Sequence, residues 1–105
     1  MEFRYNYDDM IKCSEQLNRI LLRRISEQTL DEFYNTAMNI EWQSSSAEKF
    51  REEVKYVISV IKRRKNLTEQ LKKDLKALAN FPRKAACKIR EMDNQIAIEL
   101  NELKF

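Results

Sequence analysis

Glycine is absent from this sequence of 105 residues, and proline occurs once, at Pro82. Tight β-turns often need residues with positive φ, which glycine adopts at little cost, so a β-rich fold of this size is disfavoured. Residues that favour helices are abundant, and charged residues make up 35% of the chain. The sequence therefore predicts an all-α fold of long amphipathic helices, in a single domain that spans residues 1–105.

The first helix is expected over about residues 8–40. Asp8 and Asp9 suit its N-terminus, because carboxylates accept hydrogen bonds from free amides and complement the helix dipole. Apolar residues then recur three and four positions apart, as on one face of an amphipathic helix. This spacing is weaker through the stretch RRISEQTLDEF, where the apolar stripe shifts face or the helix is locally irregular.

A reversal of the chain is expected at residues 41–46, where three serines follow the only tryptophan, Trp42. Any of the serines at 44–46 can cap the next helix, because a serine hydroxyl accepts a hydrogen bond from a free amide of the first turn. Ser45 with Glu48 also forms a capping-box pattern. The next helix is therefore expected to begin near residue 46.

This second helix, expected over about residues 46–80, has the most regular apolar stripe. Steps of four and three residues connect its members, which are Phe50, Val54, Val57, Ile61, Arg64, Thr68, Leu71, Leu75, Leu78, Pro82, Ala85, Ile89, Met92 and Ile96. Two of them, Arg64 and Thr68, are polar. Pro82 lacks the amide hydrogen of a helical residue, so we expect either a kink there or a break before a helical extension over about 83–103. A heptad repeat of this length requires the surface of a partner helix.

Together the two helices predict an antiparallel helical hairpin. A first helix of about 33 residues is about 50 Å long, so it can cover only the second helix and not the extension. The stripe beyond about residue 80 would then need another chain, either a second copy or a different helical protein. The residues expected at the interface with the partner are Leu17, Ile20, Phe33, Phe50, Val54, Val57, Ile61, Leu71, Leu75 and Leu78.

Charge is segregated along the chain. Residues 1–53 carry a net charge of −4, residues 54–90 a net charge of +10 and residues 91–105 a net charge of −3. A basic surplus of this kind can bind an acidic protein, a nucleic acid or an anionic surface. An alternative function is therefore the binding of nucleic acid or of an anionic surface through residues 62–90, although no aromatic residues are interleaved with the run KRRK.

The residue types argue against catalysis. Histidine is absent, and the two cysteines, Cys13 and Cys87, lack metal-type spacing, so zinc sites and Cys–His or Ser–His–Asp nucleophile systems are not expected. In the predicted hairpin the two thiols lie far apart, and no intrachain disulfide is expected. Phosphate-binding loops need glycine-rich backbone. We therefore expect a non-enzymatic protein without cofactor or metal.

No apolar run approaches the roughly 20 residues of a membrane span. The N-terminal residues MEFRYNYDDM also lack the apolar region of a signal peptide. A cytoplasmic location is therefore expected.

The turn carries a motif. Trp42 is followed by Gln43 and Ser44, then by small residues, and by Phe50 eight positions after the tryptophan. This spacing resembles the WXG family of type VII secretion proteins of Gram-positive bacteria, which are helical hairpins of about 100 residues without signal peptides. Ser44 stands where that family has glycine. The resemblance extends over most of the chain, in length and in the order of helix, turn and longer helix.

The resemblance implies pairing with another helical chain in a four-helix bundle. It also implies an export signal in the tail, Tyr-x-x-x-Asp/Glu, which aligns here with Ile89 and Asp93 and so lacks its aromatic residue. Some members accompany the helical N-terminal domain of an LXG toxin to the secretion machinery and its ATPase. The function implied is a targeting factor or chaperone for such a toxin, exported with it or retained in the cell. An unrelated helical adaptor of the same shape is the remaining alternative.

Overall fold

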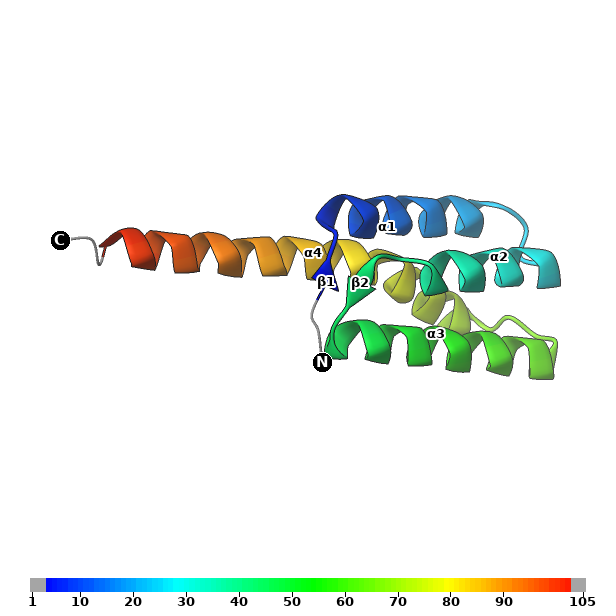
Figure 1. Ribbon diagram of the computed structural model, residues 1–105. Helices are drawn as coiled ribbons and strands as arrows, with labels where there is room; N and C mark the ends of the chain where they lie inside the picture. Colours follow the sequence, from blue (N-terminus) through cyan, green and yellow to red (C-terminus); the bar gives the residue numbers. More distant parts are fainter. Residues whose placement is uncertain (1–3, 103–105) are drawn as a thin grey trace.

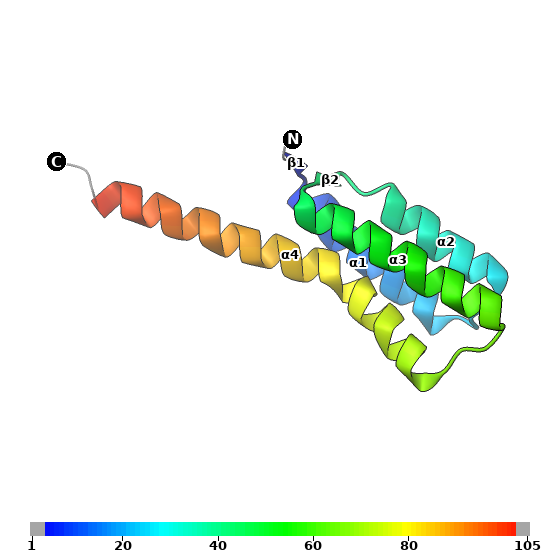
Figure 2. The ribbon, with the colours of Figure 1, turned by 90° about the horizontal axis from the view of Figure 1, so that it is seen from below.

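The computed structural model describes the backbone of residues 4–102 and the side chains of residues 4–90. Figures 1 and 2 show the helices running alternately in opposite directions, with the last one extending well past the others. The elements in chain order are β1 (Arg4–Tyr5), α1 (Tyr7–Leu22), α2 (Glu27–Met38), β2 (Trp42–Gln43), α3 (Ser45–Arg64) and α4 (Glu69–Glu102). The predicted all-α class is confirmed apart from the short two-stranded sheet.

The region expected as one helix over residues 8–40 is two antiparallel helices, so this prediction was wrong. Ser26 is the reason, because its hydroxyl accepts a hydrogen bond from the Thr29 amide at 3.3 Å, while the Thr29 hydroxyl accepts one from the Ser26 amide at 2.6 Å. This reciprocal capping box starts a new helix at Glu27. The chain reversal brings the buried faces of α1 and α2 onto the same core.

The helix expected over residues 46–80 is also interrupted, since α3 ends at Arg64 and α4 begins at Glu69. Lys65 takes the left-handed conformation, with φ 52° and ψ 30°, and its amide donates to the Ile61 carbonyl at 2.9 Å. At the other side of the break, the Thr68 hydroxyl accepts from the Leu71 amide at 3.2 Å. The two polar members of the stripe, Arg64 and Thr68, therefore flank a reversal of the chain. The simple two-helix hairpin is replaced by four helices.

α4 continues through Pro82, so a break at the proline is excluded. Pro82 itself is fully buried. A proline inside a helix removes one backbone hydrogen bond and crowds the preceding turn. Here the next amide, that of Arg83, donates to the hydroxyl of Ser14 on α1 at 2.9 Å. Ser14 is only 1% exposed, so this hydrogen bond satisfies its buried hydroxyl group.

The short sheet ties the N-terminus to the connection between α2 and α3. Arg4 pairs with Gln43 and Tyr5 with Trp42 in antiparallel register. The Asn6 amide then donates to the Glu41 carbonyl at 3.1 Å. The chain does reverse at the predicted residues 41–46, between α2 and α3. The reversal contains an extended segment that pairs with the N-terminus, and the sequence did not indicate this pairing.

Lys65→Gly is expected to stabilise the fold by about 0.5–1 kcal/mol. A non-glycine residue with positive φ carries a steric cost that glycine avoids, although glycine also increases the entropy of the unfolded chain. Urea denaturation followed by circular dichroism measures the change. Lys65→Ala is the matched control, because it removes the same charge and keeps the Cβ atom. A Lys65→Gly protein no more stable than Lys65→Ala would contradict this assignment of strain.

Candidate functional site

Three aromatic side chains from distant parts of the chain meet at the end of the bundle. Trp42 of β2 is fully buried, and its ring centroid lies 5.9 Å from that of Phe50 on α3 and 5.9 Å from that of Phe81 on α4. The rings of Phe50 and Phe81 are stacked, with centroids 5.8 Å apart and planes at 10°. The spacing from Trp42 to Phe50 thus corresponds to a direct contact. The contacts of Phe81 were not predicted, because Phe81 lies off the apolar stripe and its position next to Pro82 suggested only a kink or a break.

Ser44 is the cap of α3. Its hydroxyl accepts a hydrogen bond from the Ala47 amide at 3.1 Å, and the side chain is 6% exposed. The candidate capping box of Ser45 and Glu48 is therefore shifted by one residue from the actual cap. The φ of Ser44 is −172°, an extended conformation open to any residue. A glycine is not required at this position of the turn, and Gln43 beside it is exposed in the short sheet.

Arg51 on α3 stabilises the connection between α2 and α3 through hydrogen bonds to its backbone. Its guanidinium donates to the Ile40 carbonyl at 3.1 Å and to the Trp42 carbonyl at 2.6 Å. The Trp42 indole nitrogen, in contrast, has no hydrogen-bond partner in the described part of the chain. The tryptophan is therefore held by its backbone and by ring contacts. Sequence reasoning missed Arg51, whose only signal was its position directly after Phe50.

The residues predicted as a partner interface are mostly inside the chain's own core. Leu17, Ile20, Phe33, Phe50, Val54, Val57, Ile61 and Leu75 are buried, and Leu71 and Leu78 pack against them as half-buried residues. The additional reversals at residues 23–26 and 65–68 cause this, because they let four short segments cover one another. These side chains are therefore already packed against other parts of the same chain.

The two positions aligned with an export signal lie on α4. Ile89 is half-buried and packs against the core. Next to it, the Arg90 guanidinium lies 4.8 Å from the ring centroid of Tyr7, the first residue of α1, and 3.6 Å from the Asp8 carboxylate. Asp93 continues the helical backbone, and its side chain lies outside the described residues. Arg90 thus marks the place where α4 leaves the bundle.

A hollow of about 460 Å³ lies beside this place. It is bordered by Tyr5, by the serines at 44–46 and by one face of α4 with Phe81, Lys84, Ala85, Lys88 and Ile89. Phe81 is 37% exposed, and Lys84 and Lys88 form no ion pair among the residues whose side chains are described. The hollow therefore combines exposed apolar surface with two cations that have no ion pair among the described side chains.

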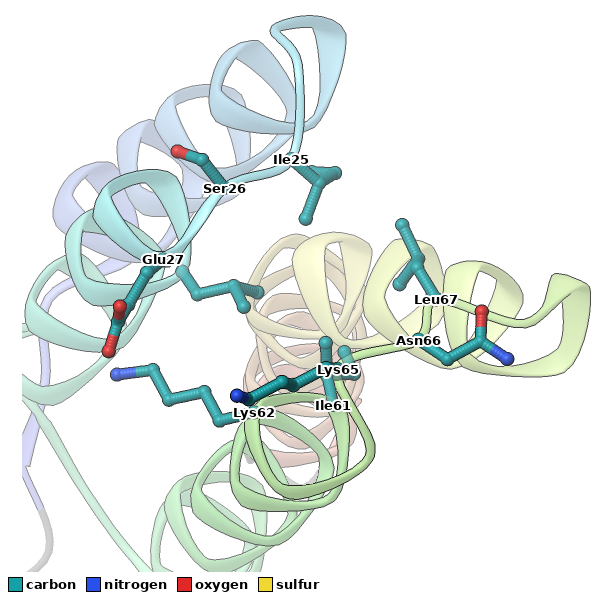
Figure 3. A pocket seen from close by; sticks show the side chains of 9 residues that line it. Ile25, Ser26, Glu27, Ile61, Lys62, Lys65, Asn66 and Leu67 are labelled. Atoms are coloured by element: carbon teal, nitrogen blue, oxygen red, sulfur yellow. The ribbon is translucent and has the colours of Figure 1, made fainter.

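A second cavity, of about 350 Å³, lies at the opposite end of the bundle (Figure 3). Ile25 and Leu67 line it from the two chain reversals that the sequence did not predict. Glu27 and Lys62 lie on its other side, and Lys62 also donates to the Asp31 carboxylate, which raises the pKa of this ammonium group. The two reversals therefore meet around a single cavity.

The thiols differ in environment. Cys13 is buried, and its thiol donates to the Thr36 carbonyl at 3.7 Å. Burial, together with the nearby Asp9 carboxylate, raises the pKa of Cys13 to about 12. The thiolate is the reactive form, so Cys13 is a poor nucleophile at neutral pH. Cys87 on α4 is exposed, and both cysteines are free.

The described residues contain neither a metal-binding cluster nor a membrane-spanning helix. Within them, no cluster of three or more His, Cys, Asp or Glu side chains is arranged to hold a metal ion. None of the helices in that part of the chain combines the length and hydropathy needed to cross a bilayer. The features that remain as a candidate functional site are the packed turn around Trp42 and the part of α4 that leaves the bundle.

Ser44→Gly is expected to destabilise the protein by about 0.5–1 kcal/mol, because it removes the hydroxyl cap and adds backbone freedom to the unfolded chain. Ser44→Ala should cost about 1 kcal/mol through loss of the cap alone. Thermal denaturation compares both with Ser45→Ala, a neighbouring exposed serine whose loss should have little effect. A stabilising Ser44→Gly substitution would instead mean that this turn prefers the glycine geometry of the WXG family.

Comparison of the chain with protein-family models, curated proteins and solved structures finds no match.

Proposed function

We propose that this chain is a non-enzymatic interaction protein that binds a helix of another chain through the part of α4 beyond the bundle. The observation that supports this proposal is the length of α4. It has 34 residues, whereas α1, α2 and α3 have 16, 12 and 20. At 1.5 Å per residue α4 is about 51 Å long, more than the rest of the bundle can cover.

Residues 91–102 of α4 form the projecting segment. Figures 1 and 2 show its backbone extending past α1 and α3 without a neighbouring element, and the longest dimension of the molecule is 63 Å. Met92, Ile96 and Leu100 follow Ile89 at helical spacing, whereas Ala97 and Ile98 lie off this stripe. Residues spaced by three and four lie on one face of a helix. A lone helix with such a face gains stability by packing against another helix.

The resemblance to the WXG family suggests the biological setting. We propose that the partner is a type VII secretion substrate, such as the helical domain of an LXG toxin, and that this chain acts as its targeting factor or chaperone. The direct contact between Trp42 and Phe50 gives a physical role to the spacing that carries the resemblance. Of the two positions aligned with the export signal, Asp93 falls at the start of the projecting segment and Ile89 just before it, so both would lie close to the partner.

Ile96→Asp is expected to weaken binding of the helical partner at least tenfold, because a carboxylate is introduced into the apolar face. Asn94→Asp is the matched control, since it introduces the same charge on the opposite face of the same helix. Co-expression with the N-terminal helical domain of an LXG toxin from the same genome, followed by co-purification, gives the first measurement. Equal recovery with both variants, or no recovery with the wild-type chain, would contradict the proposal.

A second candidate is binding of nucleic acid or another polyanion, as the basic segment suggested. Arg63, Arg64 and Lys65 are exposed at the end of α3, and Lys73 and Lys76 are exposed at the start of α4. Within the described side chains none of these five cations forms an ion pair. They are therefore available to an anionic partner, at the end of the bundle opposite to the projecting segment (Figure 1).

If this candidate is correct, the wild-type chain binds duplex DNA at low salt, and its affinity falls steeply as salt increases. The double substitution Arg63→Glu and Arg64→Glu should weaken binding about tenfold or more, because two cations become anions. Fluorescence anisotropy with labelled DNA measures this effect. Lys12→Glu with Arg19→Glu on α1 changes the net charge equally and serves as control. Absence of binding at low salt would exclude the candidate.

A further inference from the structure

We propose that the helix covering the projecting segment is the same segment of a second copy, and that the two α4 helices pair in antiparallel orientation about a two-fold axis near Asn94. The pairing rests on the proposed function, since the second copy covers the apolar face of α4 assigned there to a partner. It identifies the occupant of that face when no other helical protein is bound.

Charge along α4 distinguishes a second copy from an arbitrary helix. Residues 83–90 carry four basic residues and no acidic residue, whereas residues 91–102 carry four acidic residues and no basic residue. Parallel pairing would place like charges beside each other. Antiparallel pairing places the acidic end of each helix beside the basic stretch of the other. A two-fold axis uses the same surface twice, so a helix with this charge order is complementary to itself.

The apolar residues set the register. With the axis near Asn94, Met92 of one copy lies opposite Ile96 of the other, and Leu100 lies beside Ile89. The paired region extends over about residues 86–102 of each chain, or roughly 25 Å of helix. This length provides about five helical turns per copy for contact.

In the same register, Glu99 of each copy falls beside Lys88 of the other, on the same flank of the apolar face. Lys88 and Lys84 are exposed and form no ion pair among the described side chains. They border the hollow of about 460 Å³ that also exposes Phe81 and Ile89. The end of the second copy's helix therefore meets this hollow at Lys88 and Ile89, where the negative charge of its Glu99 faces a cation.

One residue opposes the pairing. Asp93 lies near the axis on the other flank, so the two copies bring like charges together there. Asp93→Asn is therefore expected to tighten the dimer, whereas most polar substitutions on this face should weaken it. An unrelated mode of association would not give this increase.

Light scattering after size exclusion and sedimentation equilibrium of the full chain test the pairing. We expect a dimer for the wild-type chain and for Asn94→Asp, and at least tenfold weaker association for Ile96→Asp. Lys88→Glu should weaken the dimer about fivefold or more, and adding Glu99→Lys should restore it, since the swap recreates both ion pairs. Circular dichroism confirms that each variant remains helical. A monomeric wild-type chain at about 100 µM would overturn the proposal.

Orientation is tested by disulfide formation in a Cys87→Ser background, where Cys13 is buried and poorly reactive. A mixture of Met92→Cys and Ile96→Cys chains of different size should give mainly the mixed dimer when the helices are antiparallel. A majority of identical pairs would indicate parallel helices and overturn the proposal.

The two proposals fail separately. A monomer that still binds the toxin domain through Ile96 would overturn self-pairing alone. A dimer that depends on Ile96, without binding of any toxin domain, would support self-pairing and contradict the secretion role.

Discussion

The hydrogen bond from the Arg83 amide to the Ser14 hydroxyl allows a proline to lie within α4. Without such an acceptor, a proline in a buried helix would leave a polar group unsatisfied, at a cost of about 1–3 kcal/mol. Ser14 provides it from the middle of α1. Close by, the Asn18 side chain donates to the Asn80 side chain at 2.9 Å, so a second polar contact joins the same two helices. These contacts align α1 with α4 across the proline.

The rest of the architecture depends on this alignment. Because α4 remains continuous, its first part closes the bundle and its last part extends beyond it. Phe81, directly before the proline, completes the cluster with Trp42 and Phe50. Arg90 then fixes the point of departure through Tyr7 and Asp8. The aromatic cluster and the projecting segment are therefore connected by one continuous helix, α4.

Sequence patterns predicted several of the helix faces and contacts from which the fold is built. The faces of α1, α3 and α4 were recognised from their apolar spacing, and the contact between Trp42 and Phe50 follows the spacing that first drew attention to the turn. The reversal at Ser26 was missed because its cap resembles an ordinary polar stretch within a helix. The reversal after Arg64 was missed because the heptad phase continues across it, although two successive polar members of the stripe were present. Arg51 and Phe81 were not predicted, since their partners are distant in the chain.

By itself, the sequence determined that the chain is helical, that its helices are amphipathic, and that α4 continues in apolar phase past Pro82 with a change of charge sign near residue 90. These properties are local, because helix propensity and side-chain spacing act within a few turns. Only the tertiary structure decided which apolar helix faces pack against each other. Two extra reversals bury the expected interface within one chain, and beyond residue 90 the backbone of α4 has no neighbouring element in the described part of the chain. The physical reason is that each apolar helix face can be buried against several others in the chain. Periodicity identifies these faces but does not determine which of them pack together.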